Sequence, residues 1–307
     1  MYPIRFEPAY QSYVWGGDRI PKIFHRPLPK GRYAESWEIS DREEGMSVVA
    51  NGEWKGKTFR ELLGLLKEKL VGKGKSWECF PLLIKIIDAK ENLSIQVHPN
   101  DEMAARLNAQ PKTEMWIALE KSDVYAGLKP KTTEEALAEA IEQKRAEYLL
   151  EKVTLQKGEA IFIPGGCVHS ICAGALLLEI QQNSNTTYRL YDWGRVGRAL
   201  HLKEGFSSIR WEEQTPEKLK VSFSQTDGHH RLASVLSSPY FIVERLEIAD
   251  RWQLKSHAKT FQVLFCLEGD AILENESLRP GQTYLIPAAS QPMSIEGRCQ
   301  LISIRLP

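Results

Sequence analysis

Two histidines and a carboxylate in this chain stand beside strand-like runs and are of the residue types that bind a divalent metal. Gln96 and His98 are two residues apart in an alternating run, so on a strand both side chains point to one face. Glu114 directly precedes an apolar run, and His169 follows a Pro-Gly-Gly turn. Imidazole and carboxylate ligands together suit a borderline metal, with zinc as the first choice. The residue types therefore predict a mixed nitrogen and oxygen metal site.

For each candidate ligand, the alternative is a purely structural role in the core or at the surface. A single histidine on a strand is more often a core or surface residue than a ligand, and residues so far apart in sequence need a fold that brings them together. Glu114 is the hardest to explain in this way, because a carboxylate that enters an apolar strand costs several kcal/mol unless a cation or donor meets it. Cys167 and Cys172 flank His169, so a thiolate ligand is an alternative to an ordinary buried thiol.

The chain contains an internal repeat of a small β unit. Two pairs of segments correspond: 157–164 with 279–287 and, more loosely, 115–120 with 261–269. In the first pair a glycine stands six residues before a proline that ends the strand, since proline cannot donate to a ladder. The first copy continues to His169 five residues after its proline, whereas the second has Pro292 at that place. One copy is therefore expected to carry the chemistry and the other to be structural.

Composition limits the class of protein. The 307 residues can form two domains with buried cores, and 42% hydrophobic with 26% charged residues is typical of a soluble protein. Lys+Arg and Asp+Glu are equal at 40 each, which argues against nucleic acid or a membrane as the main partner. No apolar run approaches the roughly 20 residues of a membrane span, and no secretory signal is evident. Five cysteines without a Cys-x-x-Cys pair predict reduced thiols in the cytoplasm.

Short strands bounded by turns predominate, so the sequence predicts a mainly β protein. The expected strands lie at 80–87, 93–97, 115–119, 160–163, 175–181 and 240–248. The expected helices lie at 58–67, 101–107 and 133–150, and Thr58 with Glu61 predicts a capping box. We expect 175–181 to form an antiparallel hairpin with the strand edge at His169.

A polar, weakly patterned stretch predicts where the domains divide. We expect a metal-bearing catalytic domain over 1–210, a linker over 211–231 and a second domain without metal ligands over 232–307. The pair His229-His230 falls in this linker and is expected to be solvated rather than metal-binding.

Three motifs together resemble a known family. The segments 93–101 (LSIQVHPND), 112–116 (KTEMW) and 164–171 (PGGCVHSI) are similar to the signature of the type I mannose-6-phosphate isomerases, which are zinc-dependent cupins. Similarity at 15–17, 35–38 and 187–195 extends the resemblance over essentially the whole chain and matches the short bacterial or archaeal form. The resemblance implies two cupin, jelly-roll-like β-barrel domains with a few inserted helices. It also implies a sugar phosphate as the partner.

Carried over by motif position, the resemblance implies that His98, Glu114 and His169 bind one zinc ion per chain. Gln96 matches the fourth ligand of some members, and others use water there. One departure is Asn185, where many members carry an aspartate shortly before the catalytic arginine. That departure argues against a carboxylate at 185 as the essential base.

The resemblance implies roles for four further residues. Arg189 matches the catalytic arginine, Glu179 an acidic position that lines the pocket, and Lys85 and Lys112 lysines near the substrate. Lys112, Glu179 and a zinc-bound water are alternative proton carriers. Candidates for binding the 6-phosphate are Arg189, Arg195 and Lys85. The alternatives are that Lys85 extends to solvent and that the two arginines form a surface ion-pair cluster.

The implied reaction needs these residue types. Interconversion of an aldose and a ketose moves a proton between C1 and C2 through an enediol, so negative charge develops on two adjacent oxygens. A divalent metal polarises the carbonyl, and a guanidinium such as that of Arg189 adds fixed positive charge. An iron cupin oxygenase and a non-catalytic metal- or sugar-binding cupin are the alternative functions. Mannose itself or a pentose phosphate are alternative substrates, and the sequence leaves the oligomeric state open.

Overall fold

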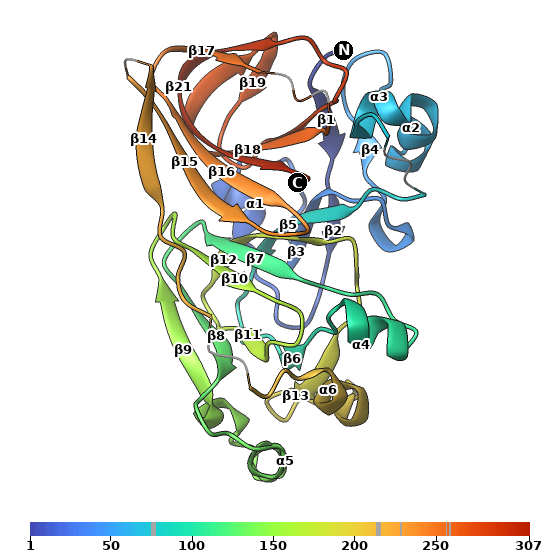
Figure 1. The fold of residues 1–307 in the computed structure, drawn as a ribbon, viewed down its shortest axis with the longest axis vertical. Helices are drawn as coiled ribbons and strands as arrows, with labels where there is room; N and C mark the ends of the chain where they lie inside the picture. Colours follow the sequence, from blue (N-terminus) through green and yellow to red (C-terminus); the bar gives the residue numbers. More distant parts are fainter. Residues whose placement is uncertain (75–77, 213–215, 228, 256, 258) are drawn as a thin grey trace. The chain divides into compact units, whose positions relative to one another are not determined.

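The computed structural model describes residues 1–74, 78–212, 216–227, 229–255, 257 and 259–307 (Figure 1). Antiparallel strands make up most of the regular secondary structure of the described residues, and the helices are short. Two compact units are present: unit 1 contains 1–9, 37–81 and 220–307, and unit 2 contains 10–36 and 82–219. The predicted mainly β fold class is confirmed.

Unit 2 contains the strands that carry the candidate metal ligands. In the described residues one sheet has the order β10-β7-β12-β5-β3-β2, with the bounds β2 (Ala9–Gln11), β3 (Glu35–Ile39), β5 (Leu82–Asp88), β7 (Glu114–Ala118), β10 (Ala160–Ile163) and β12 (Leu176–Gln182). A second sheet has the order β13-β6-β11-β8-β9, with the bounds β6 (Ile95–Val97), β8 (Ser122–Leu128), β9 (Leu150–Leu155), β11 (His169–Ile171) and β13 (Tyr188–Tyr191). The central strands β5 and β12 are almost completely buried, and most of their side chains are leucine or isoleucine.

Unit 1 contains one large antiparallel sheet. Within the described residues its order is β14-β15-β16-β21-β18-β20-β1-β4, with β17 paired to β21 and β19 to β18. The bounds are β1 (Ile4–Glu7), β4 (Val48–Val49), β14 (Ser222–Asp227), β15 (His230–Ser237), β16 (Ile242–Ile248), β17 (Arg251–Leu254), β18 (Gln262–Leu273), β19 (Glu276–Leu278), β20 (Thr283–Ile286) and β21 (Met293–Arg305). Its apolar core is separate from that of unit 2.

The helices agree in part with the sequence. The α-helices are α1 (Arg19–Ile23), α2 (Phe59–Leu66), α3 (Glu68–Val71), α4 (Asp101–Arg106), α5 (Glu134–Glu142) and α6 (Leu202–Ser208), with 3-10 turns η1 (Glu43–Gly45) and η2 (Ala146–Leu149). The predicted capping box of α2 is confirmed, since Thr58 and Glu61 bond reciprocally. The single helix predicted over 133–150 is wrong, because Lys144 has a positive φ of 56° that ends the helical path before η2. Helices α1, α3 and α6 were not predicted. Among the described residues no helix is long and apolar enough to cross a membrane.

The predicted hairpin between the edge at His169 and strand 175–181 is wrong. Strand β11 pairs with β6 and β8, whereas β12 pairs with β5 and β7 in the other sheet. The chain changes sheet at a turn through Gly174, which has a φ of 88°. Strands β11 and β12 therefore belong to different sheets, and the chain passes from the candidate ligand His169 into the other sheet of unit 2.

The predicted internal repeat is confirmed by the strand pairing. In the first copy β10 pairs with β7, and Ile163 lies opposite Glu114. In the second copy β20 pairs with β18, and Ile286 lies opposite Gln262. Both isoleucines directly precede the proline that ends their strand.

The compact units differ from the predicted domain division. Residues 37–81 belong to unit 1 although the sequence placed them in the catalytic domain. The predicted linker 211–231 contains β14 and the start of β15, which pair with each other and extend the sheet of unit 1. Residues 213–215 and 228 of that stretch lie outside the described residues. The predicted boundaries between independently folding domains stay a prediction.

Candidate active site

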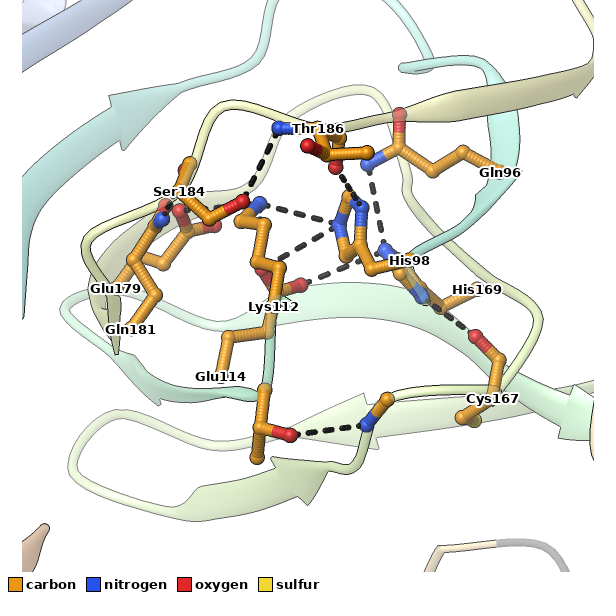
Figure 2. A network of polar contacts seen from close by, with 12 residues as sticks. Gln96, His98, Lys112, Glu114, Cys167, His169, Glu179, Gln181, Ser184 and Thr186 are labelled. Carbon is orange, nitrogen blue, oxygen red and sulfur yellow. Dashed lines mark hydrogen bonds and ion pairs between the residues drawn. The ribbon is translucent and has the colours of Figure 1, made fainter. Parts of the chain in front are cut away.

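The fold brings His98, Glu114 and His169 together, as Figure 2 shows. His98 directly follows β6, Glu114 begins β7 and His169 begins β11, so both sheets of unit 2 contribute. One ligand atom from each residue lies within 4.8 Å of the others, and all three side chains are buried. Glu114 Oε2 lies 3.5 Å from His98 Nε2, and Oε1 lies 3.4 Å from His169 Nε2. The carboxylate thus faces both imidazoles.

Backbone carbonyls set the orientation of the two imidazole rings. His98 Nδ1 lies 2.8 Å from the carbonyl oxygen of Thr186, and His169 Nδ1 lies 2.9 Å from that of Cys167. A carbonyl can only accept, so each Nδ1 carries the hydrogen and each Nε2 presents its lone pair toward Glu114. This is the tautomer that a metal-binding histidine requires.

Electrostatics fit a divalent cation between these three residues. Burial holds the pKa of His98 well below its usual value and lowers that of His169 to about 4, so both rings are neutral ligands at neutral pH. Burial, reinforced by the charge of Glu179, raises the pKa of Glu114 to about 7. Neither oxygen of Glu114 has a hydrogen bond of good geometry, although Lys112 Nζ lies 2.7 Å from Oε2 as an ion pair. A bound cation would compensate both buried oxygens.

Gln96 and Cys167 flank the cluster. Gln96 pairs with His169 across β6 and β11, and its side-chain amide lies 3.3 Å from His169 Nε2 (Figure 2). The atom near the ring is the amide nitrogen, and Oε1 lies 3.4 Å from Ser94 Oγ, so the amide would offer its oxygen to a metal only after a half-turn. Burial raises the pKa of Cys167 to about 12, and its Sγ contacts the carbonyl oxygen of Val168, so the thiol is neutral. Cys167 is not part of the cluster of His98, Glu114 and His169, so the geometry does not support the alternative of a thiolate ligand from Cys167.

A buried lysine and carboxylate network adjoins the metal ligands. Glu179 Oε1 lies 3.3 Å from Lys85 Nζ and 3.8 Å from Lys112 Nζ, and Trp116 donates to its Oε2 at 3.1 Å. Burial alone would raise the pKa of Glu179, but the two lysines outweigh it and lower the pKa to about 2. Lys112 Nζ also lies 3.1 Å from His98 Nε2. Glu179 is therefore ionised beside the metal ligands.

The alternative that Lys85 extends to solvent is wrong. Its side chain is buried, and Nζ lies 3.4 Å from Glu35 Oε2 as well as 3.3 Å from Glu179 Oε1. Burial would lower the pKa of Lys85, yet the two carboxylates raise it, so the ammonium stays charged. Glu35 was not predicted as a site residue. Like Glu114 it begins a buried strand, but Ser36 and Glu38 interrupt the apolar pattern of β3, so the signal in the sequence was weaker.

A cavity of about 240 Å³ in unit 2 opens beside this network. Lys85, Lys112, Glu179 and Gln96 line it together with Arg189, so the structure brings these five predicted residues to one space. The amide of Asn185 lines the same cavity.

Arg189 and Arg195 have different surroundings. Arg189 donates from Nε to Ser94 Oγ at 3.3 Å and from Nη1 to the carbonyl oxygen of Ala199 at 2.7 Å. Arg195 is bound to Asp192 at 2.7 Å and is not among the residues that line the cavity. Its predicted role in substrate binding stays a prediction. Arg198, which the sequence analysis did not select, does line the cavity.

Comparisons with known proteins agree with the site. The phosphomannose isomerase type I catalytic domain matches residues 4–134, and the mannose-6-phosphate isomerase cupin domain matches 232–306. Mannose-6-phosphate isomerase ManA of Bacillus subtilis is 34% identical, with 98% of each chain covered. The mannose-6-phosphate isomerase of Streptococcus mutans is 31% identical over 98% of this chain and 97% of its own. A crystal structure of mannose 6-phosphate isomerase from Bacillus subtilis superposes with a TM-score of 0.90 at 30% identity, covering 99% of both chains. The chain therefore belongs to the type I phosphomannose isomerases, as its motifs predicted, and has the cupin fold of that family.

Proposed function

We propose that this enzyme interconverts mannose 6-phosphate and fructose 6-phosphate through an enediol, with one zinc ion per chain. The observation that carries the proposal is the buried set of His98, Glu114 and His169, whose ligand atoms lie within 4.8 Å of one another. Two neutral imidazoles and a carboxylate suit zinc. When bound, the metal supplies Lewis-acid polarisation of the substrate carbonyl. Gln96 is proposed as the fourth protein ligand.

The proton transfer is assigned to Glu179 and Lys112. Glu179 is ionised and lines the cavity, so its Oε1 can take the proton from C2 and return it to C1. Lys112 Nζ, between Glu114 and Glu179, can give a proton to the oxygen on C1 and receive one from the oxygen on C2. These transfers balance, since the isomerisation needs no further reactant. Lys85 keeps Glu179 ionised and orients it.

Arg189 is proposed to stabilise the charge of the enediolate. Its guanidinium lines the cavity, and its Nε is held by Ser94, whose Oγ lies 3.4 Å from Gln96 Oε1. A fixed guanidinium beside the ligand set lowers the energy of negative charge that develops on the substrate oxygens. The lysines and arginines of the cavity favour a phosphorylated hexose over mannose itself, and they do not suit an iron oxygenase.

The test is an isomerase assay on protein whose metal content is measured. Metal-depleted protein should lose turnover of mannose 6-phosphate, and zinc should restore it. Consumption of oxygen with iron would favour the oxygenase, and metal binding without turnover would favour a non-catalytic cupin. A cytoplasmic location and the lack of a nucleic-acid or membrane partner stay predictions.

A further inference from the structure

We propose that Arg198, seated on Asp192, binds the phosphate of the substrate, and that Arg195 supports this pair without contacting the substrate. The inference rests on the proposed function and assigns a role to a further residue of the same cavity. Arg198 lines the cavity with Arg189, and Arg195 does not.

Arg195 and Arg198 both bind Asp192 but differ in their other contacts. Its carboxylate is buried, and Oδ1 accepts from Arg195 Nη2 at 2.7 Å and from Arg198 Nη1 at 2.9 Å. The other terminal nitrogen of Arg195 lies 3.8 Å from Glu91, so two carboxylates neutralise this guanidinium. Among the described residues, the side chain of Arg198 pairs with Asp192 alone. Its Nε and Nη2 therefore remain available to a ligand.

The charges around Arg198 match a phosphate monoester. Arg189 and Arg198 line the same cavity, and burial together with the charge of Arg198 lowers the pKa of Arg189. Glu91 and Asp192 offset the charge of Arg195, whereas Arg198 shares Asp192 alone. The guanidinium of Arg198 can donate two parallel hydrogen bonds to the oxygens of a dianionic phosphate. Arg189 is then left to the charge of the enediolate.

Contacts link the candidate metal ligand His169 to one arginine of the cavity. They lead from His169 to Gln96, from Gln96 to Ser94, and from Ser94 to Arg189. Arg198 lines the same cavity but takes no part in this series, since its side chain pairs with Asp192. The reacting carbons of an open-chain hexose 6-phosphate lie at one end and its phosphate at the other. A substrate whose carbonyl faces the metal ligands therefore needs a cation outside this series for its phosphate, and Arg198 supplies one.

The test compares Arg198→Gln with Arg195→Gln, which removes the neighbouring charge outside the cavity. Arg198→Gln should raise KM for mannose 6-phosphate about 10–100-fold, the loss expected for charge-assisted hydrogen bonds, with kcat within about twofold. Inhibition by inorganic phosphate should weaken by a similar factor. Any slow turnover of mannose, which lacks the phosphate, should be unchanged. Arg195→Gln should change KM much less.

Three outcomes would overturn the assignment. They are a wild-type KM and phosphate inhibition in Arg198→Gln, an equal loss with mannose and mannose 6-phosphate, or a larger KM rise in Arg195→Gln. If Arg198→Gln does not fold, Arg198→Lys serves instead and should show a smaller KM rise, because an ammonium lacks the planar fork. If the wild type fails to isomerise mannose 6-phosphate, the proposed function fails. Calorimetric binding of inorganic phosphate to both proteins then still tests Arg198.

Discussion

Gln262 occupies in β18 the register position that Glu114 occupies in β7. Each residue lies opposite the isoleucine that precedes the strand-ending proline, Ile286 in one copy and Ile163 in the other. Glu114 faces two imidazoles, whereas Gln262 Nε2 donates to the hydroxyl of Ser303 at 2.6 Å. The second copy thus has a neutral amide where the first has a charged candidate ligand. Metal chemistry is confined to the first copy in this interpretation.

Introducing a carboxylate into the second copy should not create a metal site. Gln262→Glu places an acid at the matching position, but Pro292 stands where the first copy has His169, so no imidazole joins it. We expect elemental analysis to find one zinc per chain, as in the wild type. Two zinc ions per chain would show that the second copy can bind a metal.

Removing the carboxylate of the first copy should remove the metal. Glu114→Gln leaves the two imidazoles without their anionic partner. Zinc affinity should fall by more than the roughly 10–100-fold that is usual when a residue hydrogen-bonded to a metal ligand is replaced. The fold should hold, because unit 1 has its own core and the amide preserves the side-chain volume. Elemental analysis and circular dichroism check both statements, with Gln262→Glu as the matched control. Global unfolding, or zinc retained at wild-type affinity, would contradict them.

Arg189→Ala should lower kcat by roughly 10²–10³ with zinc content unchanged, the usual cost of losing one preorganised donor to an oxyanion. Lysine should rescue only part of the loss. Steady-state kinetics separates this role from phosphate binding. A raised KM with an unchanged kcat would move Arg189 to the phosphate, and wild-type constants would remove it from the site.

The histidines of unit 1 should be dispensable. His229, His230 and His257 lie outside the cluster of candidate ligands, and His230 instead accepts a hydrogen bond from the backbone of Ala249. His257→Ala should retain zinc and turn over at close to the wild-type rate. A large loss of kcat with zinc retained would place the site in the carboxyl-terminal part of the chain.

A surface pair in the metal-bearing unit should contribute stability that depends on pH. Hydrogen bonds from Lys152 and Thr154, at 2.8 and 2.6 Å, hold the pKa of Asp123 below its ordinary value. A carboxyl whose folded pKa is depressed stabilises the fold above its unfolded pKa, near 3.9, and this contribution disappears as the pH falls through the folded value. Asp123→Asn should lower Tm slightly at pH 7, and the difference should begin to shrink near pH 4 and vanish once the pH is below the folded pKa of Asp123. A Tm difference that persists at pH 2 would contradict the linkage.

Local sequence patterns predicted the individual strands and helices of the site. They predicted less well how these strands pair. Alternation around Gln96 and His98, the glycine-to-proline spacing and the cap at Thr58 are short-range signals, and the structure has each at the expected place. The hairpin at His169 was mispredicted, because the choice between two sheets depends on partners distant in sequence. The extent of α5 was mispredicted, because polar residues continue the helical pattern beyond its end.

Side-chain surroundings were the least predictable part of the site. Arg195 and Arg198 have the same residue type and the same aspartate within reach, and only the folded loop shows which of them lines the cavity. Glu35 joins Lys85 across the sheet, a contact between residues about fifty positions apart that no local pattern indicates.

The most direct test of the account is turnover of mannose 6-phosphate by one preparation of protein, measured with its metal, after chelation and after zinc is returned. A coupled assay should detect fructose 6-phosphate with the original protein, show its loss after chelation and show its recovery at about one zinc per chain. Glu114→Gln should fail to recover. Full activity of metal-free protein, or recovery in Glu114→Gln, would contradict a catalytic metal held by His98, Glu114 and His169.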